Sequence, residues 1–171
     1  VAPLSNWFEP IYKQVESVTM PFGETMICDG MFSNCTSLVN VAIPEGVERI
    51  ENNAFARCSA LSAISLPSSL RAIGEGVFME CKSIVAIGIP DMVMNIGAYA
   101  FYGCTKLKDV SVSRNLRELA DGVFGGCPAL DSIYVPSSVT NLGAYIFGPQ
   151  IRAVYFVGNA PHYDESVDSS T

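Results

Sequence analysis

Apolar residues recur along the chain at a fixed interval, a 23-residue period, and polar residues fill the positions between them. Phenylalanine holds one position of this unit in six successive copies: Phe32, Phe55, Phe78, Phe101, Phe124 and Phe147. Cysteine follows at the third position after it in five copies: Cys35, Cys58, Cys81, Cys104 and Cys127. An aliphatic residue comes three positions after each cysteine: Leu38, Leu61, Ile84, Leu107 and Leu130. Such strict self-similarity predicts a repeat architecture in which equivalent residues stack on one another.

The middle of each unit alternates apolar and polar residues, which predicts a short β-strand. The alternating pairs are Val41 and Ile43, Ile64 and Leu66, Ile87 and Ile89, Val110 and Val112, and Ile133 and Val135. Proline at 44, 67, 90 and 136 then ends the strand, because it cannot donate to a strand ladder. The stretch from Ile50 to Cys58 is interpreted as a compact turn or a short helical segment that carries Phe55 inward. Gly74, Gly97 and Gly143 lie near its start and suit a tight turn.

A single unit cannot close a core alone, so the units are expected to stack into a continuous apolar column. The predicted fold is a solenoid of about six repeats in a curved right-handed coil, with short parallel strands joined by turns or short helical segments. Three regions are expected: a degenerate N-terminal cap over 1–14, the solenoid over 15–157, and a polar tail or linker over 158–171. Trp7 and Phe8 are expected to shield the first end.

The unit from Phe32 to Ala54, F-x-x-C-x-x-L-x-x-V-x-I-P-x-x-V-x-x-I-x-x-x-A, resembles the BspA-type leucine-rich repeat. The resemblance covers about residues 15–157, and the chain departs from the pattern only locally, at Ser113 in place of proline and at Glu24 in place of an aliphatic. Members of that family are mostly secreted or surface-attached proteins of bacteria, some of them of protists. The resemblance therefore implies a leucine-rich-repeat solenoid, extracellular or cell-surface exposure, a role in adhesion or recognition, and no catalytic residues.

The composition agrees with a folded binding protein and argues against several other classes. The chain has 171 residues, of which 49% are hydrophobic and 16% are charged, so it can bury a sizeable core. Its net charge of −7 repels phosphate backbones, which argues against nucleic acid as a partner. No apolar run approaches the roughly 20 residues of a transmembrane helix. The oligomeric state stays open.

The cysteines and the single histidine are the residues that could carry chemistry. Neighbouring ladder cysteines lie one repeat apart without a histidine partner, so we expect a column of buried free thiols in preference to disulfides or a metal site. Cys28 lies off this ladder and is either a buried turn residue or a free surface thiol. His162 lies in the polar tail, where no rigid frame holds it as a catalytic base. No catalytic residue, metal site or cofactor is therefore predicted.

Binding is expected on the strand residues that face outward. These pairs are Asn40/Ala42, Ala63/Ser65, Ala86/Gly88, Asp109/Ser111, Ser132/Tyr134 and Ala153/Tyr155. The tyrosines of the last two pairs are candidate hot-spot residues, because exposed tyrosine buries much area at low entropic cost. Their simpler interpretation is support of the strand surface. The candidate polar rim beside them comprises Lys108, Asp109, Asp131 and Arg152, and Tyr99 and Tyr102 form a second candidate patch on the turn side.

Two functions compete on this evidence. The first is a non-catalytic binding or adhesion module of a secreted or cell-surface protein, which recognises a protein or a glycan through its exposed strand face. The alternative is a rigid spacer within a larger surface protein, which the small outward residues of the middle layers favour. An enzyme is not expected, because the acidic pairs, metal clusters and placed histidine of a catalytic site are missing from the sequence.

Overall fold

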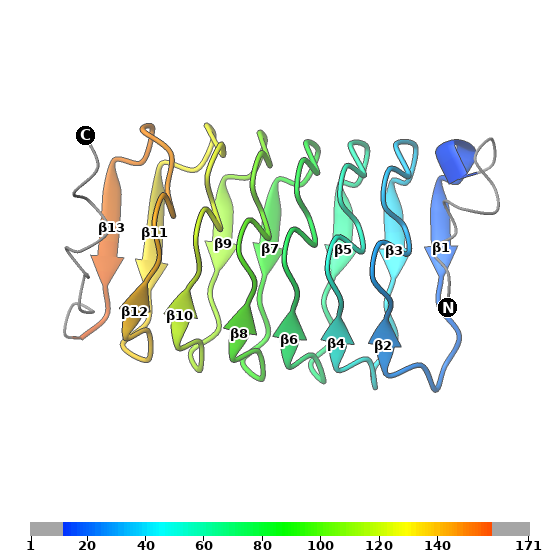
Figure 1. Ribbon diagram of the computed structural model, residues 1–171, viewed down its shortest axis with the longest axis horizontal. Coiled ribbons are helices and arrows are strands. Elements are labelled where there is room, and N and C mark those ends of the chain that lie inside the picture. The colour runs from blue at the N-terminus through cyan, green and yellow to red at the C-terminus, as the bar shows by residue number, and fades with distance from the viewer. Residues whose placement is uncertain (1–11, 159–171) are drawn as a thin grey trace.

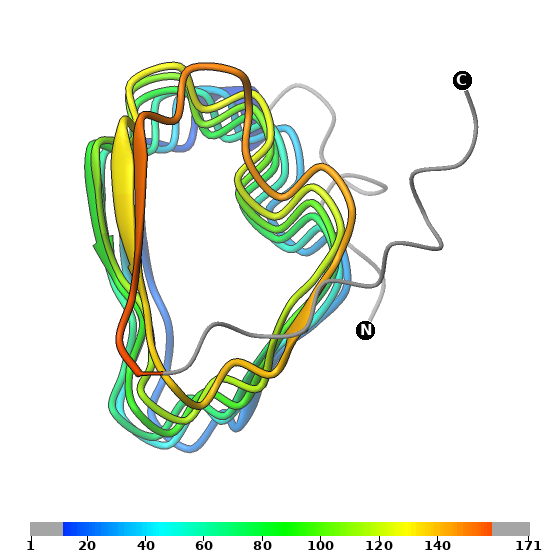
Figure 2. The same cartoon turned by 90° about the vertical axis from the view of Figure 1, so that its left-hand side faces the viewer.

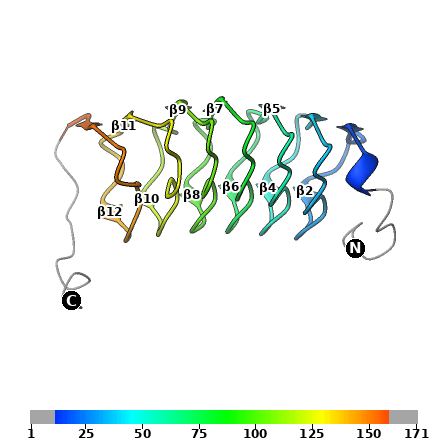
Figure 3. The same ribbon diagram turned by 90° about the horizontal axis from the view of Figure 1, so that it is seen from above.

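The chain winds into a row of parallel layers, each of which adds one strand to each of two faces (Figures 1 and 3). The structure is a computed structural model, and it describes residues 12–158. Seen along the row, successive coils nearly superpose (Figure 2). Paired strands are offset by one repeat, as in Ser17 opposite Asn40. The predicted solenoid of 23-residue repeats is therefore confirmed.

The longer strands form one face of the stack, which we call the strand face. They are β1 (Ser17–Thr19), β3 (Asn40–Ala42), β5 (Ala63–Ser65), β7 (Ala86–Gly88), β9 (Asp109–Ser111), β11 (Ser132–Val135) and β13 (Ala153–Phe156). The predicted alternation is confirmed, since Val41 and Ile87 point inward while their neighbours on the strand are exposed. Side chains on a strand alternate between its two faces, so each layer offers two outward residues to solvent.

The opposite face carries a second set of parallel strands that the sequence pattern did not predict. They are β2 (Met26–Ile27), β4 (Arg49–Ile50), β6 (Ala72–Ile73), β8 (Asn95–Ile96), β10 (Glu118–Leu119) and β12 (Asn141–Leu142). Each contributes one inward aliphatic, such as Ile50 or Ile73. Two residues are too few to show a period of two, so the sequence revealed only the buried position.

The connection that follows each short strand is a compact turn. Of the two interpretations of residues 50–58, the turn is confirmed, and the only helical element among residues 12–158 is the 3-10 turn Tyr12–Gln14. In five successive layers the turn passes twice through the left-handed region, as at Asn53 (φ 56°) and Arg57 (φ 62°). These two left-handed residues enclose Phe55, whose side chain points into the core with none of its surface exposed.

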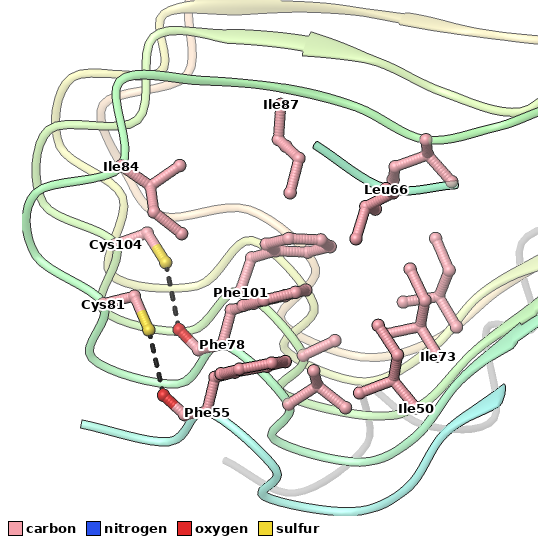
Figure 4. Packing of buried hydrophobic residues seen from close by; sticks show 14 of the residues in the cluster. Ile50, Phe55, Leu66, Ile73, Phe78, Cys81, Ile84, Ile87, Phe101 and Cys104 are labelled. Atoms are coloured by element: carbon pink, nitrogen blue, oxygen red, sulfur yellow. Dashed lines mark hydrogen bonds between the residues drawn. The ribbon is translucent and has the colours of Figure 1, made fainter. Parts of the chain in front are cut away.

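The core consists of aligned columns of identical or similar side chains (Figure 4). Successive phenylalanine rings from Phe32 to Phe147 are stacked, with centroids 5.2 to 6.4 Å apart and interplanar angles of 18° or less. Four of the five ladder thiols beside this column, those of Cys58, Cys81, Cys104 and Cys127, donate a hydrogen bond to a phenylalanine carbonyl, for example from Cys81 Sγ to Phe55 O at 3.1 Å. Because the column continues from layer to layer, each ring packs against the rings of the neighbouring layers. The phenylalanines therefore stabilise the stacking of the layers.

The regular placement of Gly97 within the unit has a different cause from the tight turn that we expected. Its φ angle is not in the left-handed region. A Cβ atom at this position would instead lie 2.4 Å from the backbone nitrogen of Glu75 and 2.6 Å from the carbonyl carbon of Gly74. Close approach of two layers, and not a special backbone conformation, therefore requires glycine here.

The two ends of the solenoid depart from the regular unit. The first layer is degenerate in sequence but still pairs in register, with Val18 opposite Val41. The last layer is shifted, since Ser132 pairs with Ala153, two positions earlier than the regular repeat would place its partner. Trp7, Phe8 and the expected cap over 1–14 lie outside the described residues apart from 12–14, and so does the tail apart from Gly158.

Ser113 replaces the proline of the other units without leaving a buried polar group unsatisfied. Its side chain is fully buried, and its hydroxyl donates to the carbonyl oxygen of Val93 at 2.6 Å. The same hydroxyl accepts a hydrogen bond from the backbone N–H of Asn115 at 3.2 Å. This departure from the repeat pattern therefore changes the packing only locally.

Candidate binding face

The strand face is divided into three separate sheets. β1, β3 and β5 form the first, β7 and β9 the second, and β11 and β13 the third. The ladder is thus interrupted between β5 and β7 and again between β9 and β11, although the layers themselves continue without a gap in Figure 1. The second interruption lies directly beside the residues that the sequence indicated for binding.

Three shallow hollows lie over the strand face. The largest, of about 730 Å³, extends from β7 across β9 to β11, and we call it the Tyr134 hollow. Its lining includes Gly88, Ser111, Ser132 and Tyr134. A second hollow of about 480 Å³ lies over β3 and β5 and is lined by small, uncharged residues and aliphatics. Only the first of these two therefore offers an aromatic ring together with charged groups.

Tyr134 and Tyr155 form a stacked pair at the edge of the Tyr134 hollow. They lie opposite each other on β11 and β13, with ring centroids 4.8 Å apart and planes 19° from parallel. Exposed fractions of 64% for Tyr134 and 48% for Tyr155 leave both rings open to solvent. One face of the Tyr134 ring is covered by Tyr155, and the other forms part of the wall of the hollow. Stacking of this kind holds the ring in place.

Three of the four predicted rim residues belong to the same hollow. Lys108, Asp109 and Asp131 all line it and are exposed, whereas Arg152 and Tyr155 belong to the last layer and are not part of its lining. The structure thus brings Tyr134 together with two carboxylates and one ammonium group. Arg152 is exposed on the layer behind them and donates its backbone N–H to Asp131 O at 2.7 Å.

The charged residues at the hollow do not form ion pairs with one another. Some ionic residues elsewhere that lie one layer apart do form pairs, such as Arg71 with Glu48 at 3.7 Å and Arg114 with Asp91. Lys108 and Asp131 are also one layer apart, but neither forms an ion pair with another residue in the range 12–158. Their charged groups are therefore available to a ligand.

A third hollow, which sequence reasoning missed, adjoins the first. It has a volume of about 440 Å³ and is lined by Val112, Arg114, Pro136, Ser137 and Val157, together with residues that also line the Tyr134 hollow. Those shared residues are Val110, Ser111 and Tyr134. No motif marks this hollow, because its lining comes from three layers that only the fold brings together.

The turn-side tyrosines have a structural explanation. Tyr99 and Tyr102 contact each other edge to face, with centroids 5.9 Å apart. A Cβ atom on Gly122 would lie 2.5 Å from the Tyr99 ring, and one on Gly125 would lie 2.9 Å from the Tyr102 ring. The two rings therefore cover the glycine backbone of the next layer, which accounts for both tyrosines without a ligand.

The ladder cysteines are free and buried, as the sequence predicted. Burial raises the pKa of the Cys81 thiol to about 12 and that of the Cys127 thiol to about 11. Thiols with such pKa values are poor nucleophiles and poor metal ligands at neutral pH. Cys28 is also free and is half-buried. Among the described residues, no group of three or more histidine, cysteine and carboxylate side chains is arranged to hold a metal ion.

The geometry defines a class of protein, a leucine-rich-repeat solenoid whose strand face is open and whose interior is a set of columns. The family model described as a BspA type leucine rich repeat region matches residues 13–151 in six copies. The chain therefore belongs to the BspA-type leucine-rich repeat family. Proteins of this family are typically non-catalytic, and such repeats serve protein–protein interaction. None of the helices within residues 12–158 has the length and hydrophobicity that crossing a bilayer requires.

Solved structures of bacterial leucine-rich repeat proteins are similar to this chain. One from Bacteroides ovatus is 31% identical with a TM-score of 0.80, over 87% of this chain and 38% of the other. The T. pallidum leucine-rich repeat protein is 32% identical with a TM-score of 0.68, and the match covers 85% of this chain and 62% of that protein. The pneumococcal vaccine antigen PcpA shares the fold, with 22% identity and a TM-score of 0.65. That match covers 85% of this chain and 42% of PcpA. The chain thus spans less than two thirds of each, and no protein of curated function matches it.

Proposed function

We propose that the chain is a non-catalytic binding module of a secreted or cell-surface protein, and that it recognises a protein or a glycan on a host or microbial surface through the strand face. The observation that carries this proposal is the exposed Tyr134–Tyr155 stack beside a hollow with unpaired charges. An aromatic anchor surrounded by polar groups is the usual composition of a recognition site. Membership of a family of surface and secreted proteins supports the same function.

The residues divide this task between them. Tyr134 supplies the contact area at the hollow, and Tyr155 supports its ring from behind. Lys108, Asp109 and Asp131 supply a donor and acceptors for polar groups of the ligand, and Arg152 extends this rim in the last layer. The small residues of β7 and β9 leave the approach to the ring open.

A rigid spacer is the second candidate function, and one observation favours it. The hollow over β3 and β5 contains no aromatic or charged side chain, so the first half of the strand face offers little for recognition. Stacked layers with continuous columns form a stiff rod. Such stiffness would be enough for a spacer, which does not need to bind a ligand.

A binding screen separates the two functions. The purified protein is tested on arrays of matrix proteins and glycans, beside the double variant Tyr134→Ala/Tyr155→Ala. The matched control is Tyr99→Ala/Tyr102→Ala, which removes the same number of tyrosines from the turn side. Binding that the first variant loses and the second retains is the expected result. Absence of any ligand for the wild-type protein would contradict the binding module and favour the spacer.

A further inference from the structure

The interruption between β9 and β11 separates the polar groups of the Tyr134 hollow. β9 and β11 belong to different sheets, and Lys108 and Asp131 come just before the two strands in equivalent positions of adjacent layers. At the equivalent position of a paired layer, Arg152 N donates to Asp131 O at 2.7 Å. Among the described residues no such bond joins Asp131 to Lys108. The ladder is broken here, and the Tyr134 hollow lies over β7, β9 and β11, across the break.

The free face of the Tyr134 ring looks across this space. The residues at the matching position of β9 and β7 are Ser111 and Gly88, and neither is large enough to cover the ring. Tyr155 covers the other ring face at a centroid distance of 4.8 Å. A ligand can therefore stack on one face of the Tyr134 ring, because Tyr155 covers the other face.

The chemistry of the lining fits a sugar ring. The C–H groups on one face of a pyranose carry a partial positive charge, and they pack against the negative face of an aromatic ring. Sugar hydroxyls donate to carboxylates such as those of Asp109 and Asp131, and they accept from an ammonium group such as that of Lys108. A volume of about 730 Å³ lies within the range of small-ligand sites, which is roughly 300–1,000 Å³.

The charges also specify which sugars fit. Two carboxylates and one ammonium group line the hollow, Arg152 adds a second cation only in the layer behind it, and the chain as a whole has a net charge of −7. Uronic, sialic and sulfated sugars would be repelled by this field. The guanidinium group of Arg114 at the adjoining hollow is already paired with Asp91 and does not offset it.

We infer that the Tyr134 hollow is a subsite for a neutral hexopyranose of an oligosaccharide, and that the adjoining hollow receives the next sugar of the chain. This inference rests on the proposed function and names its ligand class. Tyr134 and Ser111 are shared by both hollows, so a linear ligand can pass from one to the other along the break between β9 and β11. The more apolar end, at Pro136 and Val157, accepts the less polar face of that next sugar.

The test uses defined trisaccharides as probes. Cellotriose, N-acetylated chitotriose and galactotriose are titrated into the protein, with trigalacturonic acid as the acidic comparison, and binding is measured by calorimetry and saturation-transfer NMR. At least one neutral trisaccharide is expected to bind, and the acidic one to bind at least about 10-fold more weakly, a difference of about 1.4 kcal/mol.

Four variants locate the binding. Tyr134→Ala is expected to weaken the affinity about 10-fold or more, which is within the range for loss of one aromatic stacking contact. Tyr134→Phe keeps the ring and should stay within about 3-fold of wild type, as should Tyr145→Ala on the turn side. Asp131→Asn should weaken binding several-fold. An unfolded variant is recognised from its circular dichroism spectrum and is replaced by Tyr134→Ser.

Each contrary result has a separate meaning. Failure of every neutral trisaccharide to bind the wild-type protein overturns the inference, as does binding that Tyr134→Ala leaves unchanged or that favours trigalacturonic acid. A protein ligand that depends on Tyr134 in the array screen, without any trisaccharide binding, overturns the sugar subsite while the proposed function stands. No ligand in either experiment overturns both.

Discussion

Inward positions of the layers repeat the same residue type, whereas outward positions vary. The phenylalanine column repeats one residue type from Phe32 to Phe147, and four of its six rings have no exposed surface. The outward column in line with Tyr134 runs through Ala42, Ser65, Gly88 and Ser111 and then changes to tyrosine. An inward side chain packs between two copies of itself, so a change in one layer disturbs its neighbours. An outward side chain is not enclosed between two copies of itself, so it can differ from layer to layer.

This difference indicates where to look for function in a repeat protein. In a solenoid, a residue type is repeated at a position because that side chain packs against its copies in the neighbouring layers. A position where repetition stops without disturbing the column, such as Tyr134, is free to serve a ligand.

Truncation of an inward ring should be the most damaging change. Phe78→Ala removes a fully buried ring that is stacked on both sides, with centroids 5.6 and 5.3 Å away. The expected loss in the free energy of unfolding is about 3–5 kcal/mol, measured by chemical denaturation. Val85→Ala, at a position with 44% exposure, is the control and should change it by less than about 0.5 kcal/mol. Equal losses would contradict the stacked column.

The inward thiols should react far more slowly than the thiol that lies off the ladder. With a pKa of about 12, Cys81 has roughly 1,000-fold less thiolate at neutral pH than a thiol at its ordinary value of 9.0. Mass spectrometry after labelling of the native protein should find Cys28 modified well before Cys81 and Cys127. Rapid modification of Cys81 without unfolding would show that the column is open to solvent.

Substitution of an inward glycine should reduce stability more than substitution of an outward one. Gly97→Ala places a Cβ atom within 3 Å of the backbone of the preceding layer, and we expect a loss of about 1–3 kcal/mol in the free energy of unfolding. Gly88→Ala is the matched variant on the outward side, where the added atom meets only Ser111 Oγ at 3.3 Å. Its effect should be within about 0.5 kcal/mol. Similar melting temperatures for both variants would contradict the close approach of layers at Gly97.

Most of the fold could be predicted because the interior is periodic. The spacing of the phenylalanines, cysteines and aliphatics predicted the layers, the strand face and the buried thiols. The second face of two-residue strands, such as Arg49–Ile50, could not be predicted, since so short an element leaves no alternation. The cause of glycine at 97 was also missed, because close approach between layers depends on three-dimensional distances.

The candidate site could be predicted only in part. Outward alternation indicated Tyr134, Lys108, Asp109 and Asp131, and the structure places all four around one hollow. The break between β9 and β11 and the adjoining hollow at Pro136 and Val157 carry no sequence signal. They depend on how adjacent layers meet in three dimensions, and the strand sequences on either side of the break resemble those of paired layers.

The smallest expected effect on stability belongs to the outward tyrosines. Tyr155→Ala removes one stacked partner of an exposed pair, and we expect a loss of about 0.5–1.5 kcal/mol in the free energy of unfolding. Its effect on ligand binding should be larger than on folding, because Tyr134 loses the ring that holds it. A variant with reduced stability and unchanged binding would assign the pair to support of the strand surface alone.

Hydroxyl-radical footprinting of the tyrosines tests the central claim most directly. The protein is oxidised with and without a ligand from the array screen, and modification of each tyrosine is read by mass spectrometry. The account predicts protection of Tyr134 and Tyr155, with Tyr102 and the highly exposed Tyr145 unchanged as internal controls on the turn side. Protection of Tyr102 and Tyr145 with Tyr134 unchanged would contradict it and would place the binding surface on the turns.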